Sequence, residues 1–171
     1  LSNDPLGELS PLLTEEINVK ATVRLAALAR DAGVGRWIQF SSCSVYGSGD
    51  GGVLDESSPA RPLTAYAAAK ARLEEGLRAL AAPGFAPVLL RLATVYGVSP
   101  RIRLDLVANQ FAAMALIRGR LDLQSDGTPV RPLVHIEDVC EAAGLALDAP
   151  AAEVSGETFN IGADEANYTV G

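Results

Sequence analysis

Tyr66 and Lys70 stand at a spacing that allows proton-transfer chemistry. They are four residues apart in a segment that predicts a helix, so both side chains lie on one face of that helix. A free tyrosine has a pKa near ~10, which is too high for a base at neutral pH. An ammonium ~5 Å away, at an effective dielectric constant of ~20, favours the phenolate by ~3 kcal/mol. The pair therefore predicts a general acid/base for a hydroxyl or carbonyl group, although a solvated helix face can carry the same spacing.

A second set of polar groups follows the strand predicted at residues 37–41. Residues 40–47 read Phe-Ser-Ser-Cys-Ser-Val-Tyr-Gly, so hydroxyl groups gather where this strand ends. In doubly wound sheets, ligands bind at the carboxyl ends of the strands. A serine hydroxyl there can donate to a substrate oxygen and stabilise a developing oxyanion. Taken alone, the segment is better explained as a serine-rich turn.

The elements that must position these groups alternate between helices and strands. Ser10-Pro11 predicts the start of a first helix, and Gly33 is placed to end it. Residues 48–62, rich in Gly, Pro, Ser and Asp, predict a loop. Further helices are expected at 64–80, 104–118 and 136–147, and further strands at 87–92, 121–123 and 158–161. This order is typical of the α/β class, with a parallel sheet flanked by helices.

An ordered series of segments resembles the extended short-chain dehydrogenase/reductase family, in particular its nucleotide-sugar epimerases and dehydratases. The serine-rich run and Tyr-x-x-x-Lys match this family in order. Further matching segments lie at residues 17–19, 91–97, 126–139, 159–162 and 167–170. The resemblance implies a partial Rossmann-like, doubly wound parallel sheet with part of a smaller substrate-binding domain. An Asp126-Gly127 turn opens one of these segments.

The same resemblance implies a domain organisation. Residues 1–100 are expected to form the C-terminal half of the dinucleotide-binding domain. Residues 101–171 are expected to belong to the substrate-binding region, with 131–162 returning in part to the Rossmann sheet. The family's glycine-rich dinucleotide loop has no match in this chain, so we expect a fragment that is inactive when isolated.

Carried over residue by residue, the resemblance implies three catalytic residues: Tyr66 as the acid/base, Lys70 lowering its pKa, and Ser42 bonding the reacting sugar oxygen. It implies NAD or NADP as the cofactor, with NAD favoured. The residues expected at the cofactor are Ser41, Tyr66, Lys70, Ala93 and Asn18, the last as an organiser of the site. Those expected at the nucleotide-sugar are Ser42, Thr94, Asn109 and Arg131, the last as a clamp on phosphate.

The implied function is an NAD(P)-dependent epimerase or reductase of a nucleotide-sugar. Family dehydratases carry Asp-Glu in the two positions after the catalytic hydroxyl, where this sequence has Cys43 and Ser44, so dehydration is disfavoured. Thr94 and Leu92-Ala93 also depart from the residues of many epimerases, which leaves the sugar open. The alternative is a noncatalytic dinucleotide-sensing or scaffold protein on the same fold, although such a protein has no need of the complete Ser, Tyr and Lys set.

Residues 47–52 fit the pattern Gly-x-Gly-x-x-Gly but are interpreted as a flexible loop. That pattern binds a pyrophosphate only where it opens a helix, whose N-terminal amides hold the phosphates. Here Pro59 and Pro62 follow, and no helical pattern begins. His135 lies between Val134 and Ile136 and is interpreted as structural.

Composition excludes several other classes. With 14 basic and 21 acidic residues, the 171-residue chain has a net charge of −7, which argues against nucleic-acid binding. One His and two distant Cys argue against a metal site and a disulfide scaffold, and favour a cytoplasmic protein. No apolar run approaches the ~18–20 residues that span a bilayer, so no membrane partner is expected. By resemblance we expect a homodimer formed through residues 11–32 and 64–80.

Overall fold

The computed structural model describes residues 3–48, 52–123, 126–128 and 130–170. Its contacts divide the chain into two compact units. The first comprises Leu1–Arg91 with Leu145–Asn160, and the second comprises Leu92–Gly144 with Ile161–Gly171. Each unit is built around a three-stranded sheet, and the α/β class with a parallel sheet is confirmed.

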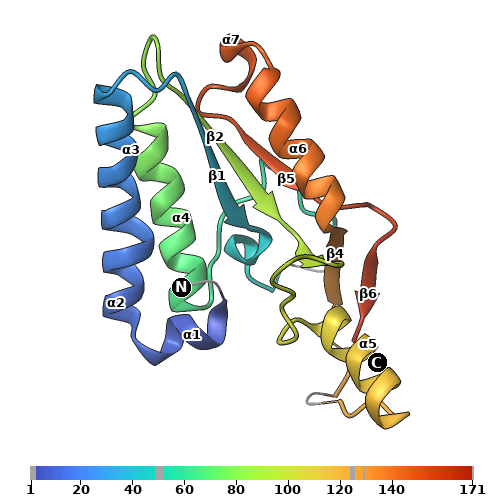
Figure 1. Cartoon of the computed structure of the whole chain (residues 1–171). Helices are drawn as coiled ribbons and strands as arrows, with labels where there is room; N and C mark the ends of the chain where they lie inside the picture. Colours follow the sequence, from blue (N-terminus) through green and yellow to red (C-terminus); the bar gives the residue numbers. More distant parts are fainter. Residues whose placement is uncertain (1–2, 49–51, 124–125, 129, 171) are drawn as a thin grey trace. The chain divides into compact units, whose positions relative to one another are not determined.

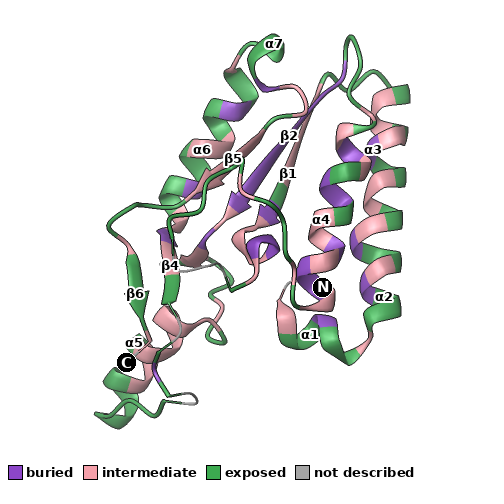
Figure 2. Ribbon diagram, turned by 180° about the vertical axis from the view of Figure 1, so that it is seen from behind, coloured by how far each residue is buried: buried purple, intermediate pink, exposed green. Residues whose placement is uncertain are grey.

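The sheet of the first unit has the strand order β1-β2-β5. These strands are β1 (Arg36–Ser42), β2 (Ala86–Leu92) and β5 (Thr158–Ile161), and their arrows run the same way in Figure 1. The central strand β2 is apolar apart from Arg91 and is buried along nearly its whole length. Such a continuous apolar run is typical of a parallel strand covered on both faces. Figure 2 shows this burial on β2 and on the helix α4.

Helices pack against this sheet and against one another. The elements before β1 are α1 (Asp4–Leu9), α2 (Pro11–Glu15), a π-helical turn η1 (Glu16–Ala21) and α3 (Thr22–Asp31). After β1 come the short 3₁₀ turn η2 (Cys43–Tyr46) and α4 (Ala65–Arg78). Leu73 and Leu77 of α4 pack with Ala26, Phe85 and Leu89 in a core from which water is excluded. Burial of these side chains fixes α4 on the sheet.

The second unit contains a mixed sheet. Its strands are β3 (Thr94–Tyr96), β4 (Val130–His135) and β6 (Asn167–Thr169), and its helix is α5 (Val107–Arg118). Strand β4 pairs in parallel with β3 and antiparallel with β6. Its small core contains Ala93, Val134 and Val139. The chain also forms α6 (Ile136–Asp148), which begins with two acidic residues that favour the positive end of a helix, and α7 (Ala151–Val154).

One expectation about local structure was wrong, and two short elements were not predicted. Residues 121–123 form no strand, whereas residues 130–135 form β4. The segment beginning at Asn167 forms the strand β6, with Val130 and Arg131 of β4 among its antiparallel partners. A short helix, α1, precedes Ser10. In each case, pairing or packing with a distant segment decided a weak local preference.

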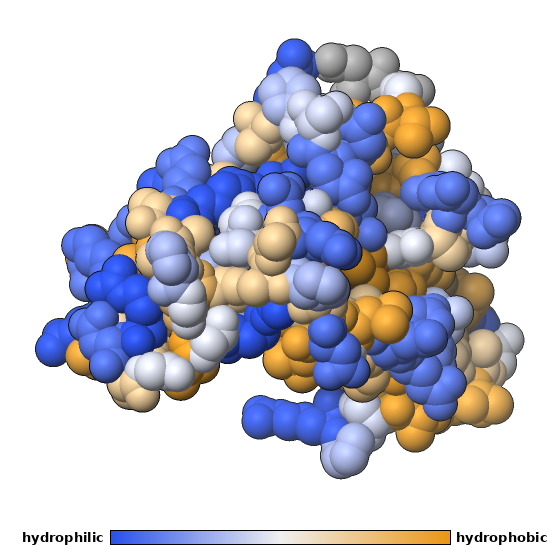
Figure 3. Space-filling model, turned by 90° about the horizontal axis from the view of Figure 1, so that it is seen from above, coloured by the Kyte–Doolittle hydropathy of each residue, from blue (hydrophilic) through white to orange (hydrophobic). Residues whose placement is uncertain are grey.

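The surface of the described residues carries apolar side chains among charged ones, as Figure 3 shows for one face. The most exposed large ones on helices include Leu9, Leu12, Leu116 and Ile117. These side chains are spread over α1, α2 and α5, and exposed apolar residues of this kind are common on protein surfaces. Across the residues that are described, no helix is both long enough and apolar enough to cross a membrane.

Candidate active site

Tyr66 lies in the first turn of α4, and Thr64 fixes where that helix begins. The Thr64 hydroxyl accepts a hydrogen bond from the amide of Ala67 at 3.1 Å, which satisfies one of the free amides of the first turn. Tyr66 is buried, with 9% of its surface exposed. Helical geometry then brings the Lys70 ammonium to 5.7 Å from the centre of the Tyr66 ring. The two groups expected to cooperate are therefore neighbours in the first unit, with Tyr66 buried and Lys70 half-buried.

The Lys70 ammonium is held by the end of β1. Its Nζ donates to the backbone carbonyl of Phe40 at 2.8 Å. Burial lowers the pKa of Lys70, and the charge of Glu74 partly opposes this effect. A lysine that donates to a fixed carbonyl and is short of water has a defined position from which it can act on the phenol.

Ser42 is the last residue of β1 and caps the turn η2. Its hydroxyl oxygen accepts from the Ser44 amide at 3.2 Å and lies 2.9 Å from the Ser44 hydroxyl. With these groups as donors, the proton of Ser42 remains available for a further acceptor. Ser41, one residue earlier, is buried and donates to the carboxylate of Glu74 at 2.6 Å. The hydroxyl of Ser41 is therefore engaged inside the protein.

Asn18 lies in the π-helical turn η1 and is buried. This turn contacts α4, the helix that carries Tyr66 and Lys70. Turns of this kind are often found at functional sites, because an inserted residue changes the direction of a side chain. The structure therefore puts Asn18, Ser41, Ser42, Tyr66 and Lys70 in the first unit.

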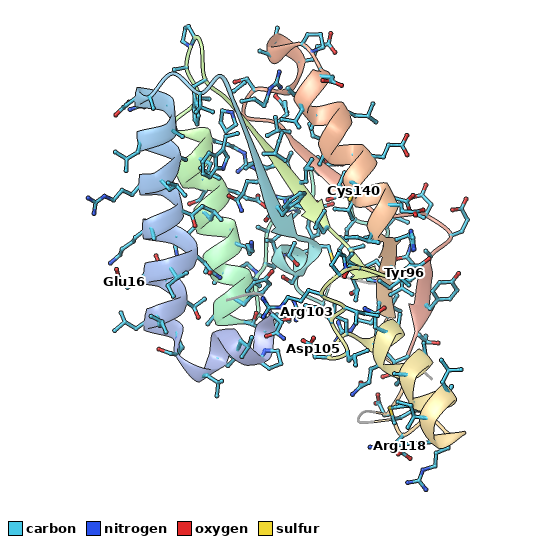
Figure 4. All side chains as sticks on the ribbon, viewed as in Figure 1. Glu16, Tyr96, Arg103, Asp105, Arg118 and Cys140 are labelled. Carbon is cyan, nitrogen blue, oxygen red and sulfur yellow. The ribbon has the colours of Figure 1, made fainter. Side chains whose placement is uncertain are left out.

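The remaining predicted residues belong to the second unit. The side chain of Asn109 accepts from the amide of Gly97 at 3.2 Å and donates to the carbonyl of Arg103 at 3.0 Å. Asn109 therefore fastens the segment between β3 and α5. In that segment Arg103 forms an ion pair with Asp105 (Figure 4).

Three more of the predicted residues lie on or beside the strands of the second unit. Ala93 is buried, and its amide donates to the carbonyl of Ile161 at 2.9 Å. Thr94 begins β3, and Arg131 is an exposed residue of β4 opposite Tyr168. The structure gives each unit its own part of the predicted residue set.

Part of the glycine pattern at 47–52 lies outside the described residues, since these exclude 49–51. Gly47 has φ of 72°, and a Cβ there would lie 2.2 Å from the carbonyl oxygen of Arg61. This glycine is thus required by a close approach of two loop segments. No helix follows Gly52 before Ala65, as the loop interpretation expects.

A buried ion pair beneath the site was not anticipated from the sequence. Glu74 has only 1% of its surface exposed, and Arg91 donates to its two carboxylate oxygens, with Nη2 2.7 Å from Oε2. Arg91 also donates to the hydroxyl of Tyr46 at 2.8 Å, and that hydroxyl donates to Asn160 at 2.7 Å. A single arginine within the apolar run 86–92 was the signal that could have revealed this network.

The network determines the charge of Glu74. Burial raises the pKa of this carboxyl, but hydrogen bonds from Arg91 and Ser41 outweigh burial and hold the pKa below its usual value. Glu74 is therefore ionised at neutral pH. Arg78, one turn further along α4, adds a contact of 3.2 Å to the same carboxylate and donates to Thr158 of β5 at 2.6 Å. Through these bonds α4 is attached to all three strands of its sheet.

Replacement of Glu74 by Gln is expected to lower the free energy of unfolding by about 3–5 kcal/mol, because Arg91 then keeps a buried charge without its counterion. Glu75→Gln is the matched control, since Glu75 is exposed on the same helix, and it should change stability little. Urea unfolding measures the free energy of unfolding of both variants. Since the folded pKa of Glu74 is lowered, the difference from wild type should persist above pH ~4.3 and shrink as pH falls through the folded pKa. Equal stability of the two variants would refute this account.

Comparison with known proteins identifies the relatives of this chain. A family model described as the NAD dependent epimerase/dehydratase family matches residues 1–162. Low-salt glycan biosynthesis protein Agl12 of Haloferax volcanii is 30% identical over 157 residues, which are 92% of this chain and 49% of that protein. UDP-glucose 4-epimerase of Mycolicibacterium smegmatis is 35% identical over 162 residues, covering 89% of this chain and 49% of the relative.

Solved structures agree. DesIV, a dTDP-glucose 4,6-dehydratase from Streptomyces venezuelae solved with NAD and TYD bound, has a TM-score of 0.82 and 35% identity over 95% of this chain and 49% of its own. UDP-glucuronic acid 4-epimerase from Bacillus cereus, solved with UDP-glucuronic acid and NAD, has a TM-score of 0.75 and 28% identity over 88% of this chain and 48% of its own. The chain spans about half the length of these proteins. It belongs to the NAD-dependent epimerase/dehydratase family.

Proposed function

We propose that the protein containing this chain is an NAD(P)-dependent epimerase or reductase of a nucleotide-sugar. The observation that supports this most directly is the Lys70 ammonium, 5.7 Å from the ring of the buried Tyr66 and bonded to the end of the strand that carries Ser42. The nucleotide-sugar is proposed because DesIV and the Bacillus cereus epimerase, with NAD in both structures, are similar to this chain. The same likeness favours NAD over NADP.

The donors of this chain fit such a cofactor. Lys70 has three N–H donors, and the contact with Phe40 uses one of them. The other two suit the vicinal hydroxyls of a ribose. We assign Lys70, Tyr66, Asn18 and Ala93 to the cofactor. Ser41 can contact the cofactor only through its backbone, because its hydroxyl donates to Glu74. A nicotinamide held by these residues would supply hydride transfer to or from the sugar carbon.

The protein's own groups would handle the proton. Tyr66, as phenolate, takes the proton of the sugar hydroxyl, so that a carbonyl forms at the carbon that loses its hydride. Lys70 stabilises the phenolate through its charge, and Ser42 donates to the sugar oxygen. On return of the hydride, Tyr66 gives the proton back. Thr94, Asn109 and Arg131 are proposed to contact the nucleotide-sugar, with Arg131 on the diphosphate.

Two reactions remain within this proposal. An epimerase returns the hydride to the other face of the same sugar and regenerates its cofactor, whereas a reductase consumes one reduced cofactor per product. Cys43 and Ser44, in place of the Asp-Glu of family dehydratases, disfavour elimination of water. Turnover of UDP-glucose or dTDP-glucose with and without added NADH distinguishes the two, because stoichiometric NADH consumption excludes the epimerase.

Tyr66→Phe is expected to reduce turnover by about 10²–10⁴-fold, since the variant keeps the ring but loses the transferable proton. Tyr168→Phe, at an exposed tyrosine of β6, is the matched control and should retain activity. Both are assayed in the full-length protein with the two nucleotide-sugars. Full turnover by Tyr66→Phe would exclude Tyr66 as the acid/base. If Tyr66→Phe left the biological activity of the parent protein unchanged, the noncatalytic sensor or scaffold function would be favoured instead.

Lys70→Met is expected to abolish turnover without loss of stability. Burial lowers the pKa of Lys70, so the folded state holds this proton less tightly than the unfolded state. The charged lysine therefore opposes folding below its folded pKa, and this opposition disappears as pH rises towards the unfolded value of ~10.4. In thermal unfolding at pH 7, the Lys70→Met protein should be at least as stable as the wild type. The difference in stability between the two proteins should narrow at alkaline pH. A large loss of stability at neutral pH would contradict this.

We also propose a homodimer through α2, α3 and α4, in a cytoplasmic protein whose Cys43 and Cys140 are free thiols. Leu25 and Leu28 of α3 are 58% and 57% exposed, which supports a covered apolar face there. Leu25→Glu should produce monomers in sedimentation experiments, while Val53→Glu, in an exposed loop, should not. An unchanged sedimentation coefficient for Leu25→Glu would exclude this interface.

A further inference from the structure

The helix α1 rests directly on the backbone of Tyr66. Gly7 of α1 is buried, and a Cβ built on it would lie 2.8 Å from the Cβ of Tyr66 and 3.1 Å from its amide nitrogen. Real Cβ atoms do not approach other heavy atoms so closely, so a larger residue at position 7 would displace one of the two helices. The absence of a side chain at Gly7 is what allows this contact.

Two carboxylates of α1 add polar bonds to the same turn of α4. The hydroxyl of Thr64 donates to Asp4, and the amide of Ala65 donates to Glu8 at 2.6 Å. These acceptors satisfy groups that the helix cannot satisfy for itself, and their charges favour its positive end. With the cap that Thr64 provides, the residues immediately before Tyr66 are fixed on two sides.

The position of α1 is itself fixed. Asn3 caps the helix by accepting from the amide of Leu6 at 3.0 Å. Thr14 of α2 is completely buried, and its hydroxyl lies 3.1 Å from the carbonyl of Gly7. The same hydroxyl lies 2.9 Å from the carbonyl of Ser10, so the two acceptors share its proton. Gly7 thus lies between Thr14 of α2 and Tyr66 of α4, and the bonds of Asp4 and Glu8 to Thr64 and Ala65 join α1 to α4.

We propose that Gly7 is a positioning residue, through which α1 sets the place of the Tyr66 phenol relative to Lys70 and Ser42. The proposal rests on the proposed function, in which Tyr66 transfers the proton. Acid/base catalysis needs the phenol within hydrogen-bond reach of the sugar oxygen, and displacement of a reacting group by ~1 Å can cost ~10²-fold in rate. A contact that only stabilised the fold would make no such demand.

The experiment compares Gly7→Ala with Gly76→Ala. Gly76 lies on α4, the helix that carries Tyr66. A Cβ at Gly76 would also approach a neighbour to 2.8 Å, namely Cγ2 of Val23 on α3. Both changes therefore crowd α4, but only Gly7→Ala does so at Tyr66. We expect both to lower the unfolding temperature, and only Gly7→Ala to lower kcat, by about tenfold or more, with a smaller change in KM for UDP-glucose or dTDP-glucose.

A second readout does not depend on turnover. Ultraviolet absorbance follows ionisation of the tyrosines, and subtraction of the matching Tyr66→Phe protein isolates Tyr66 from the four in the sequence. We expect Gly7→Ala to raise the pKa of Tyr66, because the added Cβ displaces the first turn of α4, which carries Tyr66, while the carbonyl of Phe40 holds the Lys70 ammonium in place. We expect Gly76→Ala to leave the pKa of Tyr66 unchanged. This arm remains decisive even if Tyr66→Phe shows that the proposed function is wrong.

A third variant serves if Gly7→Ala does not fold. Glu8→Ala removes the bond to the amide of Ala65 together with the Glu8 charge, whereas the control Glu8→Gln removes the charge and keeps an oxygen acceptor for that amide. We expect the pKa of Tyr66 to be higher in Glu8→Ala than in Glu8→Gln. An unchanged Tyr66 titration in both Gly7→Ala and Glu8→Ala, or in Glu8→Ala alone if the first is unfolded, would overturn the proposal.

Discussion

The carboxylate of Glu74 lies where a helix and a sheet meet, and the position of α4 on its sheet depends on it. Ser41 bonds it from the end of β1, Arg91 from β2, and Arg78 from one turn further along α4. An ion pair out of contact with water is stable only when its other hydrogen-bonding groups have partners, and here each guanidinium nitrogen of Arg91 donates to Glu74 or to Tyr46. The result is that α4 has one allowed position along β1. That position brings Lys70 to the carbonyl of Phe40 and Ser42 to the edge of the same site.

The site above this ion pair is costly to maintain. A half-buried lysine opposes folding, and burial accordingly lowers the pKa of Lys70. Glu74 reduces the cost through its charge, while the Phe40 carbonyl provides a fixed acceptor. The packing of α1 on Tyr66 is a second constraint at the same place, since the two helices approach closely only because residue 7 is glycine.

Much of the first unit could be predicted from the sequence. The strands near 37–41, 87–92 and 158–161, and the helix carrying Tyr66, were found because their apolar patterns are strong. The family was recognised from motifs spread along the chain, and the family model agrees. Two weaker elements were not predicted. Strand β4 is exposed only at its start, and β6 is exposed throughout; β4 pairs with both β3 and β6.

The sequence by itself determined which groups are available and their spacing along one helix, because the period of an α-helix fixes that Tyr66 and Lys70 share a face. It could not determine what surrounds them. Only the tertiary structure shows that Ser41 donates to Glu74 and that Arg91 donates to Tyr46. It also shows that Gly7 packs against Tyr66, which lies 59 positions later in the sequence. Local periodicity is a property of neighbouring residues, whereas burial and the partners of a buried charge depend on which distant segments pack together.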